Sequence, residues 1–501
     1  MDRRTRLLLN TSIGFFKQLI IIVCGFILPR YTLLYYGSSV TGLVSSISHF
    51  LGFITLLELG IGPVVQANLY KPLAQKDFLQ VSKVLKASDV FFKKLAVVFL
   101  LYITILSFIF PIIINKEFDK LFTISLICII SVSIFAEYFF GMTSRLLLVA
   151  DQKSYIQSLL HVVSVVLNTI LTVILVREGF SIQIVKLVTA VIFVIRPFGQ
   201  LIYVKKHYQI EKNVIIDKNI LSQRWDSFAQ HLAMVVLENV DVVVLSFFST
   251  LANIAIYNVY YLVVNSIRNV IMSSITGLES LFGDLLVRKE IEKLNKTFSI
   301  LELVIHYSVI LIFTTTAILI VPFVSVYTHG INDANYIAPL FGFIITFAYC
   351  AQCIRVPYLR LIKGAGMFKE TKIGALVAMS LNVIITIIAV IPFGLPGIAF
   401  GTFVAMFFHT LYFVIFLWKN ILMRSPKYFF YHIITDIIVI FISLVITKIF
   451  KMNSLSYFAW IILAIKVFFV VFLCDTVIHV IFYGNFIYKN IGYFIKSGGN
   501  K

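Results

Sequence analysis

The chain has 501 residues, of which 60% are hydrophobic and only 13% are charged, against about 25% charged residues in soluble proteins. This composition excludes an ordinary soluble protein, because apolar runs of roughly 20 residues, each long enough to cross a bilayer as a helix, repeat along the chain. The runs are too long and too irregular for the strands of a membrane β-barrel. The net charge of +19 lies mainly in short loops, which indicates membrane orientation and not nucleic-acid binding. We therefore predict an all-α polytopic membrane protein.

In chain order, the apolar runs predict about fourteen membrane-spanning helices, the first of them an uncleaved span. Thirty of the 42 Lys and Arg residues lie at the two termini and in alternate loops, and six lie in or beside the opposite loops. Because positively charged loops face the cytoplasm, both termini are predicted to be cytoplasmic. The predicted spans are 9–33, 40–67, 90–114, 121–146, 156–177, 182–203, 227–249, 254–281, 299–325, 338–362, 372–391, 397–418, 432–450 and 457–482.

A short internal repeat indicates how these spans are organised. The fifth span contains LNTILT from Leu167 and the eleventh contains LNVIIT from Leu381, 214 residues later and at the same topological position. Six spans in each half would make two parallel lobes, a known plan among transporters. We predict an N-terminal six-helix lobe at 1–210, a second at 211–425, and two appended spans with a cytoplasmic tail at 426–501.

Polar residues recur at steps of three or four on the first, second, seventh and eighth predicted spans, which places each set on one helix face. Small polar residues are ordinary packing groups in membranes. A charge near mid-span, however, costs about 2.5–3.5 kcal/mol on insertion scales, so these faces predict a water-filled cavity or a charged partner. For His49 and His231 both packing and a pore role are open. The set is Lys17, His49, Glu58, His231, Glu238, Asp241, Asn265, Arg268 and Asn269.

Other intramembrane charges carry less functional signal. Lys186 and Arg196 lie near the ends of the sixth span and are predicted to snorkel to the interface. For Arg355, on the tenth span, a cavity position and snorkelling are both open. Three further charges lie in the appended spans: Asp436 is predicted at a helix interface, and Lys466 and Asp475 as a structural pair or a peripheral groove.

The chain offers little for enzyme chemistry. Its five cysteines all fall within predicted spans, and Cys350-x-x-Cys353 has no second ligand pair nearby, so neither a disulfide framework nor a zinc site is predicted. The nine histidines are scattered, and we find no phosphate-binding glycine loop or nucleophile–base pair. A membrane enzyme, such as a glycan polymerase or an acyltransferase, is disfavoured, and no metal or organic cofactor is expected.

The stretch FILPRYTLLYYGSSVTGLVSSISHFLGFITLLELGIG, from Phe26 to Gly62, resembles polysaccharide flippases. These are the Wzx-type branch of the multidrug/oligosaccharidyl-lipid/polysaccharide (MOP) exporter superfamily. In that family an Arg ends the first span, where this chain has Arg30, and a polar second span follows a glycine-containing turn. The loops NLYKPLAQKD and LLLVADQKSY also resemble family loops, and fourteen spans is the family's common number.

The resemblance implies two lobes around a central cavity lined by the same four spans, working by alternating access. It implies a flippase that moves an undecaprenyl-pyrophosphate-linked oligosaccharide from the cytoplasmic to the outer leaflet of a bacterial cytoplasmic membrane. A polysaccharide polymerase and glycosyltransferases are then expected partners. Cations would attract the pyrophosphate; the candidates are Lys17, Arg268 and Arg355, and Arg30 is a further residue expected to line the cavity.

Two questions stay open after the resemblance. The cavity-facing acids Glu58, Glu238 and Asp241 either bind a coupling H⁺ or Na⁺ or pair with the basic groups. Their number also departs from a purely cationic cavity. An acidic cavity would suit a cation-coupled multidrug exporter of the same superfamily, which is the alternative function.

Overall fold

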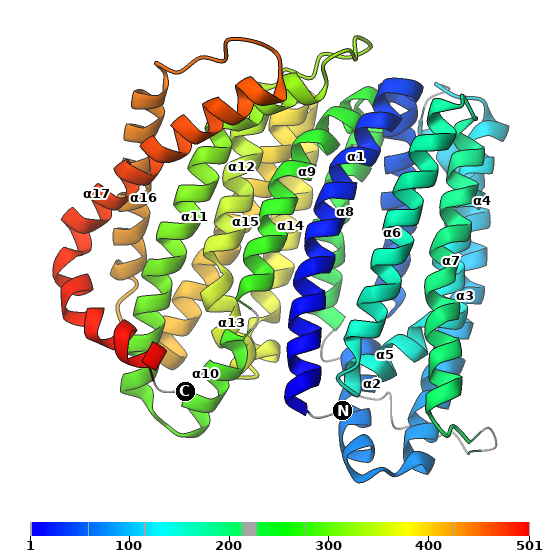
Figure 1. The fold of residues 1–501 in the computed structure, drawn as a ribbon, viewed down its shortest axis with the longest axis horizontal. Helices are drawn as coiled ribbons and strands as arrows, with labels where there is room; N and C mark the ends of the chain where they lie inside the picture. The colour runs from blue at the N-terminus through cyan, green and yellow to red at the C-terminus, as the bar shows by residue number, and fades with distance from the viewer. Residues whose placement is uncertain are drawn as a thin grey trace. The chain divides into compact units, whose positions relative to one another are not determined.

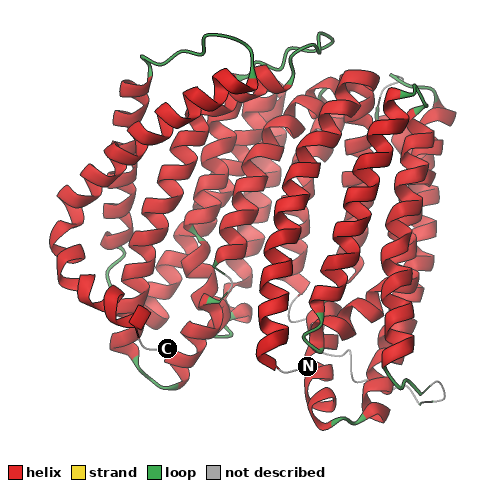
Figure 2. Cartoon of the chain, viewed as in Figure 1, coloured by secondary structure: helices red, strands yellow, loops and turns green. Residues whose placement is uncertain are grey.

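The structure is a computed structural model that describes residues 3–499, apart from 59, 115–116, 212–213, 215–227, 276 and 423. Within this part the chain is all helix and loop, with no strand (Figure 2), which confirms the predicted fold class. The segment between the sixth and seventh predicted spans, 204–226, lies largely outside the described residues. The α-helices (Figure 1) are α1 (Arg3–Gly52), α2 (Ile61–Gln75), α3 (Phe78–Ile113), α4 (Lys120–Ala136), α5 (Met142–Ala150), α6 (Ser154–Arg177), α7 (Ile182–His207), α8 (Phe228–Phe248), α9 (Leu251–Ser274), α10 (Leu278–Val287), α11 (Ile291–Tyr327), α12 (Pro339–Ile354), α13 (Val356–Gly364), α14 (Phe368–Phe393), α15 (Leu395–Leu417), α16 (Lys427–Thr447) and α17 (Tyr457–Gly499).

Thirteen described helical stretches are long and apolar enough to cross a membrane. The first, Leu9–Glu58, contains two of the predicted spans, because its backbone leaves helical geometry at Gly37, where φ is 80°. The new helix begins at Ser38, whose backbone N–H donates to Asp333 Oδ2 (2.6 Å) and whose hydroxyl donates to Oδ1 (2.7 Å). A carboxylate satisfies the unpaired N–H groups of a helix start. Counting both parts of this helix recovers the predicted fourteen spans.

The second span ends earlier than predicted. The helix tightens into a 3₁₀ segment, η1 (Phe53–Glu58), and Gly60 then adopts a left-handed conformation with φ of 68°. Glycine adopts this conformation at little cost, so the chain turns here and begins α2. The prediction that this span continues to residue 67 is therefore wrong, and its last quarter belongs to a separate helix.

Two more predicted spans are divided in the structure. The eighth, at 254–281, ends at Ser274, and α10 follows as its own short helix. The tenth, at 338–362, breaks at Arg355, just before Pro357. Proline has no backbone N–H to donate to the preceding turn, which explains why α12 and α13 are separate helices.

Large apolar side chains lie exposed along the outer helices. On α3, Leu101, Phe108 and Ile112 are 62–73% exposed, and on α14 Ile388 and Ile391 are 66% and 71% exposed. Water would penalise such surfaces, whereas acyl chains do not. This distribution and the long apolar helices identify a multi-pass membrane protein.

The chain divides into two compact units. Unit 1 comprises residues 1–262 and 330–334, and unit 2 comprises 263–329 and 335–501. The order of elements also repeats along the chain: a short helix, a long helix, a broken helix and two packed helices run from α2 to α7 and again from α10 to α15. The compact units and the repeated series of helices divide the chain at different places, so the predicted lobe boundaries at 210 and 425 stay a prediction.

The Asn and Thr of the internal repeat lie in equivalent positions of the two series. Asn168 and Thr172 on α6 are buried, as are Asn382 and Thr386 on α14. The Asn168 amide oxygen lies 3.4 Å from the Thr172 hydroxyl, and Asn382 Nδ2 donates to Thr402 Oγ1 on α15 (3.2 Å). Each motif thus buries an Asn and a Thr inside its own unit, and in the second motif the Asn bonds to a neighbouring helix.

Candidate functional site

The strongest concentration of charge inside unit 1 is a cationic cluster formed by Lys17, Arg145 and Arg196 with one carboxylate, Glu137. Arg196 Nη2 on α7 donates to Glu137 Oε2 (2.9 Å), and Arg145 Nη1 on α5 lies 3.8 Å from Glu137 Oε1. Lys17 on α1 lies close enough to both arginines for their charges to repel its own. His161 on α6 lies within reach of the same three cations. Among these described groups, three positive charges therefore meet one negative charge.

A π-helical turn shapes this cluster. The segment η2 (Glu137–Gly141) lies between α4 and α5 and carries Glu137 at its start. Such turns are rare and often occur at functional sites. Gly141 is required by close packing, because a Cβ there would lie 2.7 Å from Pro197 Cβ on α7. The missing side chain lets α7 approach the widened turn, which brings Arg196 to the carboxylate.

Glu58 lies in the same unit and is bound by a neighbour of the cluster. Tyr138, the next residue of the π-helical turn, donates its hydroxyl to Glu58 Oε1 (2.7 Å). Glu58 and Lys17 are both half-buried, and the side chain of Glu137 is 13% exposed. The Glu58 carboxylate, one of the charges for which a cavity or a partner was predicted, is therefore bound by the Tyr138 hydroxyl beside the cationic cluster.

Three of the predicted site residues on the second and seventh spans bind helix to helix within unit 1. His49 Nδ1 donates to Asn239 Oδ1 (3.0 Å), and His231 Nε2 donates to the Thr55 carbonyl (2.7 Å). Asp241 is buried and accepts a hydrogen bond from the Tyr257 hydroxyl (2.9 Å). A role of these residues in ligand binding stays a prediction.

Short polar contacts also join α1 to α8 and to α9. Ser46 and Ser246 share a hydrogen bond of 2.5 Å, and Asn258 donates to Ser45 (2.8 Å). Of the other predicted site residues in this unit, Glu238 is exposed on α8 and Arg30 is half-buried just before the kink of α1.

The predicted site residues of unit 2 lie around two further arginines. Arg268 Nη1 on α9 donates to Asn265 Oδ1 (3.0 Å), and Asn269 follows it in the chain, half-buried. Arg355 is 7% exposed and donates to His409 Nδ1 on α15 (2.5 Å). Since an arginine cannot accept, His409 must be neutral with its proton on Nε2. The positive charges of Arg268 and Arg355 act on each other, so the structure brings these two predicted residues together.

Sequence reasoning missed several members of these sites. Arg145 was counted with a loop, and His161, Glu137 and His409 were not considered. Arg196 was considered only as a residue able to snorkel, and its ion pair with Glu137 was not foreseen. The signal that could have found the cluster is Glu137 itself, a carboxylate in the middle of the fourth predicted span that needs a cation nearby.

The arrangement suits the binding of an anion and not covalent chemistry. Excess positive charge held by several helices in a poorly solvated site attracts phosphate groups strongly. No group of three or more His, Cys, Asp or Glu side chains that could hold a metal ion is found among the described residues. The geometry therefore supplies a place for a charged headgroup and, in the described residues, no set of metal ligands.

Comparison with known proteins supports the same fold. No protein-family model matches the chain, and no curated protein sequence matches it. Among solved structures, the chain is similar to the lipid II flippase MurJ in an inward closed conformation, with a TM-score of 0.70 and 17% identity, over 96% of this chain and 100% of that chain.

Two multidrug transporters are also similar. The DinF-BH MATE transporter in complex with R6G matches with a TM-score of 0.61 and 13% identity, over 85% of this chain and 98% of its own. An inward-facing MATE family transporter of the MOP superfamily matches with a TM-score of 0.59 and 15% identity, over 82% and 95%. At these identities the likeness establishes the fold alone, which the chain shares with MurJ and with the MATE transporters.

Proposed function

We propose that the chain is a flippase of the Wzx type, which moves an undecaprenyl-pyrophosphate-linked oligosaccharide across a bacterial cytoplasmic membrane by alternating access. The observation that carries this proposal is the cationic cluster of Lys17, Arg145 and Arg196 around the single carboxylate Glu137. Membrane proteins retain charges within their spans chiefly where these serve a substrate, an ion or a partner. An excess of cations matches a pyrophosphate headgroup.

Each part of such a substrate would be bound by a different class of side chain. Its pyrophosphate would meet the guanidinium groups, which bind phosphate oxygens in a bidentate manner. Its sugars would meet neutral polar side chains, and its polyprenyl tail would stay in lipid. Arg268 and Arg355 form a second cationic pair, which we propose to serve the same class of substrate. A polymerase and glycosyltransferases that make and use the repeat unit are proposed partners.

The alternative is a cation-coupled multidrug exporter, and one observation favours it. Unit 1 buries Asp241 at 5% exposure, an acid of the kind that could attract a cationic drug. The likeness to drug transporters of the same fold points the same way. We favour the flippase because the three cations of the cluster outnumber its carboxylate.

An export assay separates the two functions. In cells that lack the protein and carry a plasmid copy, we expect surface polysaccharide to return with the wild-type chain and to fall at least tenfold with Arg145→Gln/Arg196→Gln at equal expression. Drug resistance should not change. Restored drug resistance without any effect on surface polysaccharide would overturn the flippase in favour of the exporter.

A further inference from the structure

A second ionisable cluster lies in unit 2 and is not used by the proposed substrate site. It joins α11 to α16 and α17, which lie beside it in Figure 1. Each of its acids and histidines is less than a tenth exposed. We call it the α11–α16–α17 cluster, and its members are Glu302, His306, Tyr358, Arg424, His432, Asp436, Asp475, His479 and Tyr483.

Its first half contains two neighbouring pairs. His306 Nδ1 lies 2.7 Å from Asp436 Oδ2, which confirms that Asp436 lies at a helix interface. Glu302 is bound by the Arg424 guanidinium and by the Tyr358 hydroxyl. These pairs connect α11 with α16 and with the turn that precedes it.

Its second half extends the connection into α17. His432 stacks on His306 with ring centroids 4.7 Å apart, and its Nδ1 shares a hydrogen bond of 2.7 Å with the Tyr483 hydroxyl. His479 in turn stacks on Tyr483 at 5.7 Å. Its Nδ1 donates to the backbone carbonyl of Asp475 (3.0 Å) and lies 2.8 Å from the carboxylate oxygen Oδ1, which has no hydrogen-bond partner among the described residues. Of the two alternatives expected for Lys466 and Asp475, the structural pair is wrong, because Lys466 is exposed and the Asp475 carboxylate lies beside this histidine. Lys466 instead lines a surface pocket with Lys451 and Asn453.

The charges of the cluster do not balance unless it binds protons. Its described members include three carboxyl groups and one guanidinium, so neutral imidazoles would leave a net charge of −2. A net charge away from water is strongly unfavourable, and proteins usually remove it by protonation. Arg424 already neutralises Glu302. The missing charge therefore belongs to the His306–Asp436 and His479–Asp475 pairs, which need one additional proton each.

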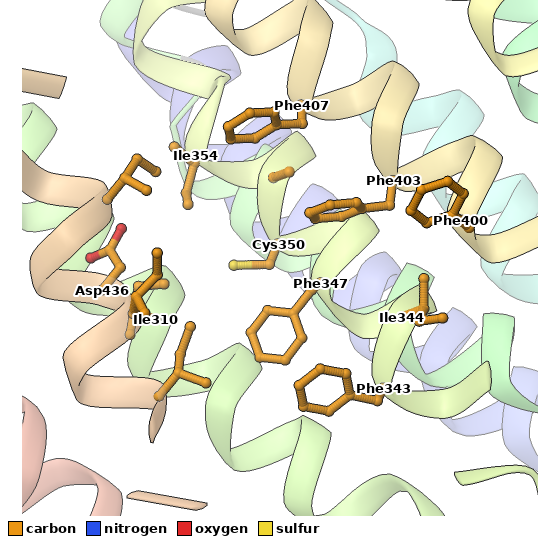
Figure 3. Close-up of a pocket in the computed structure, with 14 residues that line it drawn as sticks. Ile310, Phe343, Ile344, Phe347, Cys350, Ile354, Phe400, Phe403, Phe407 and Asp436 are labelled. Carbon is orange, nitrogen blue, oxygen red and sulfur yellow. The ribbon is translucent and has the colours of Figure 1, made fainter. Parts of the chain in front are cut away.

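The surroundings of Asp436 strengthen this requirement. Its side chain lines an apolar pocket of about 510 Å³, and Figure 3 shows phenylalanines on the opposite wall. The oxygen Oδ1 of Asp436 and the nitrogen Nε2 of His306 are buried without a hydrogen-bond partner among the described residues. No outside hydrogen bond therefore fixes which member of the pair carries the proton. The phenylalanines are Phe343, Phe347, Phe400, Phe403 and Phe407.

We propose that the α11–α16–α17 cluster is a proton-binding site that holds two protons at neutral pH and that couples transport to protons; the coupling rests on the function proposed above. Loss of the protons leaves one uncompensated negative charge on Asp436 of α16 and one on Asp475 of α17, and it removes the attraction between His306 of α11 and Asp436. The two charges repel each other across α16 and α17, while the apolar packing of Leu311 and Leu319 of α11 against α17 stays in place. Proton release would thus loosen α16 from α17 and from α11.

Other titratable groups face the two pairs and belong in any test. The Cys350 thiol on α12 interacts electrostatically with Asp436, and the Tyr358 hydroxyl interacts with both Glu302 and Asp436. The charge of Arg424 acts on His432. Tyr307 on α11 packs edge-on against His479 at 5.3 Å, and Tyr431 lies at 5.5 Å from Tyr483.

The first test measures the protons directly and needs no substrate. The full chain, with histidine rings labelled with ¹³C and ¹⁵N, is placed in lipid nanodiscs, and ring signals are assigned through His306→Gln and His479→Gln. His329→Gln, in an exposed loop, serves as the control. Infrared spectra of Asp436→Asn and Asp475→Asn report the carboxyl groups. We expect two protons in all at pH 7, counted as imidazolium or protonated carboxyl across the two pairs. Neutral imidazole with ionised carboxylate in both pairs would overturn the proposal. The protons are counted in the wild-type chain, so the result stands even where one of the variants fails to fold.

The second test concerns coupling. In proteoliposomes with a pH gradient, we expect Asp436→Asn/Asp475→Asn to keep transport of a lipid-linked sugar but to lose its response to the gradient. Glu292→Gln, an exposed acid on α11, should keep that response. A response that survives in the double variant would overturn the coupling. Absence of sugar transport in the wild-type chain, with two protons still found by spectroscopy, would instead reject the proposed function and leave the proton site standing.

Discussion

The two ionisable clusters of the molecule each hold an excess of charge within the protein, but the excess has opposite sign and different exposure to solvent. The cationic cluster in unit 1 has three positive charges around one carboxylate, and its members keep some exposure, with Arg145 43% and Arg196 22% exposed. The α11–α16–α17 cluster in unit 2 has an excess of acids, and its acids and histidines are all buried. A partly exposed excess of charge can be neutralised by a ligand that enters, whereas a buried excess can be neutralised only by small species such as protons. The difference in exposure therefore distinguishes the proposed headgroup site from the proposed proton site.

The largest effect is expected where a charge in unit 1 loses its closest partner. Arg196→Met leaves Glu137 with only the longer contact to Arg145, at 3.8 Å, and the lost hydrogen bond to a charged group contributes about 1.5–3 kcal/mol. We expect a lower melting temperature and a transport rate reduced at least tenfold. The control is Arg288→Met, which breaks an exposed pair with Asp284 and should leave melting unchanged.

A double variant sharpens this prediction. Arg196→Met/Glu137→Gln removes both charges, so melting should recover most of its loss while transport stays low. If transport recovers together with stability, the arginine supports the structure only and does not serve the substrate.

The geometry of the π-helical turn gives the next effect. Gly141→Val places side-chain atoms where a Cβ alone would lie 2.7 Å from Pro197, so α7 must move and the Arg196–Glu137 distance must grow. Overpacking of this kind typically costs about 1–3 kcal/mol. Thermal melting and transport should both fall. Gly14→Ala, where a Cβ meets nothing within 4 Å, should change neither; equal behaviour of the two variants would contradict the packing argument.

The smallest effect is expected for a neutral hydrogen bond in unit 2. Tyr483→Phe removes the hydroxyl that bonds His432 Nδ1 while keeping the stacked ring, at a cost of about 0.5–1.5 kcal/mol. Melting should fall slightly, whereas Tyr488→Phe, on an 81% exposed ring, should have no effect. A drop in melting temperature as large as that of Arg196→Met would contradict the expectation that this neutral hydrogen bond contributes less to stability than the Arg196–Glu137 ion pair.

The sequence predicted the architecture better than the site, for a physical reason. Apolar runs and loop charges report on lipid and water directly, so the all-α fold and the fourteen spans were predictable. Breaks within helices were not, because Gly60 and Pro357 act through local backbone geometry that hydrophobicity does not record. The repeat of LNTILT and LNVIIT was informative because it placed Asn and Thr at equivalent buried positions.

The candidate site was only partly predictable because charge partners depend on which helices touch. Lys17 was recognised from its position within a span, whereas Arg145 and Arg196 lie near span ends and looked like interfacial residues. Only the structure shows that α5 and α7 bring both to Glu137. The same holds for Asp475, whose partner is a histidine one turn away on its own helix.

The central claim is that the cationic cluster binds the pyrophosphate of a polyprenyl-linked substrate. Its most direct test is the binding of undecaprenyl pyrophosphate to the full chain in nanodiscs, compared between the wild type and Lys17→Gln/Arg145→Gln/Arg196→Gln/Glu137→Gln, in which no charge of the cluster is left unpaired. We predict a dissociation constant at least tenfold higher in the variant, a difference of about 1.4 kcal/mol. Equal affinity of the two proteins, both folded, would contradict the account.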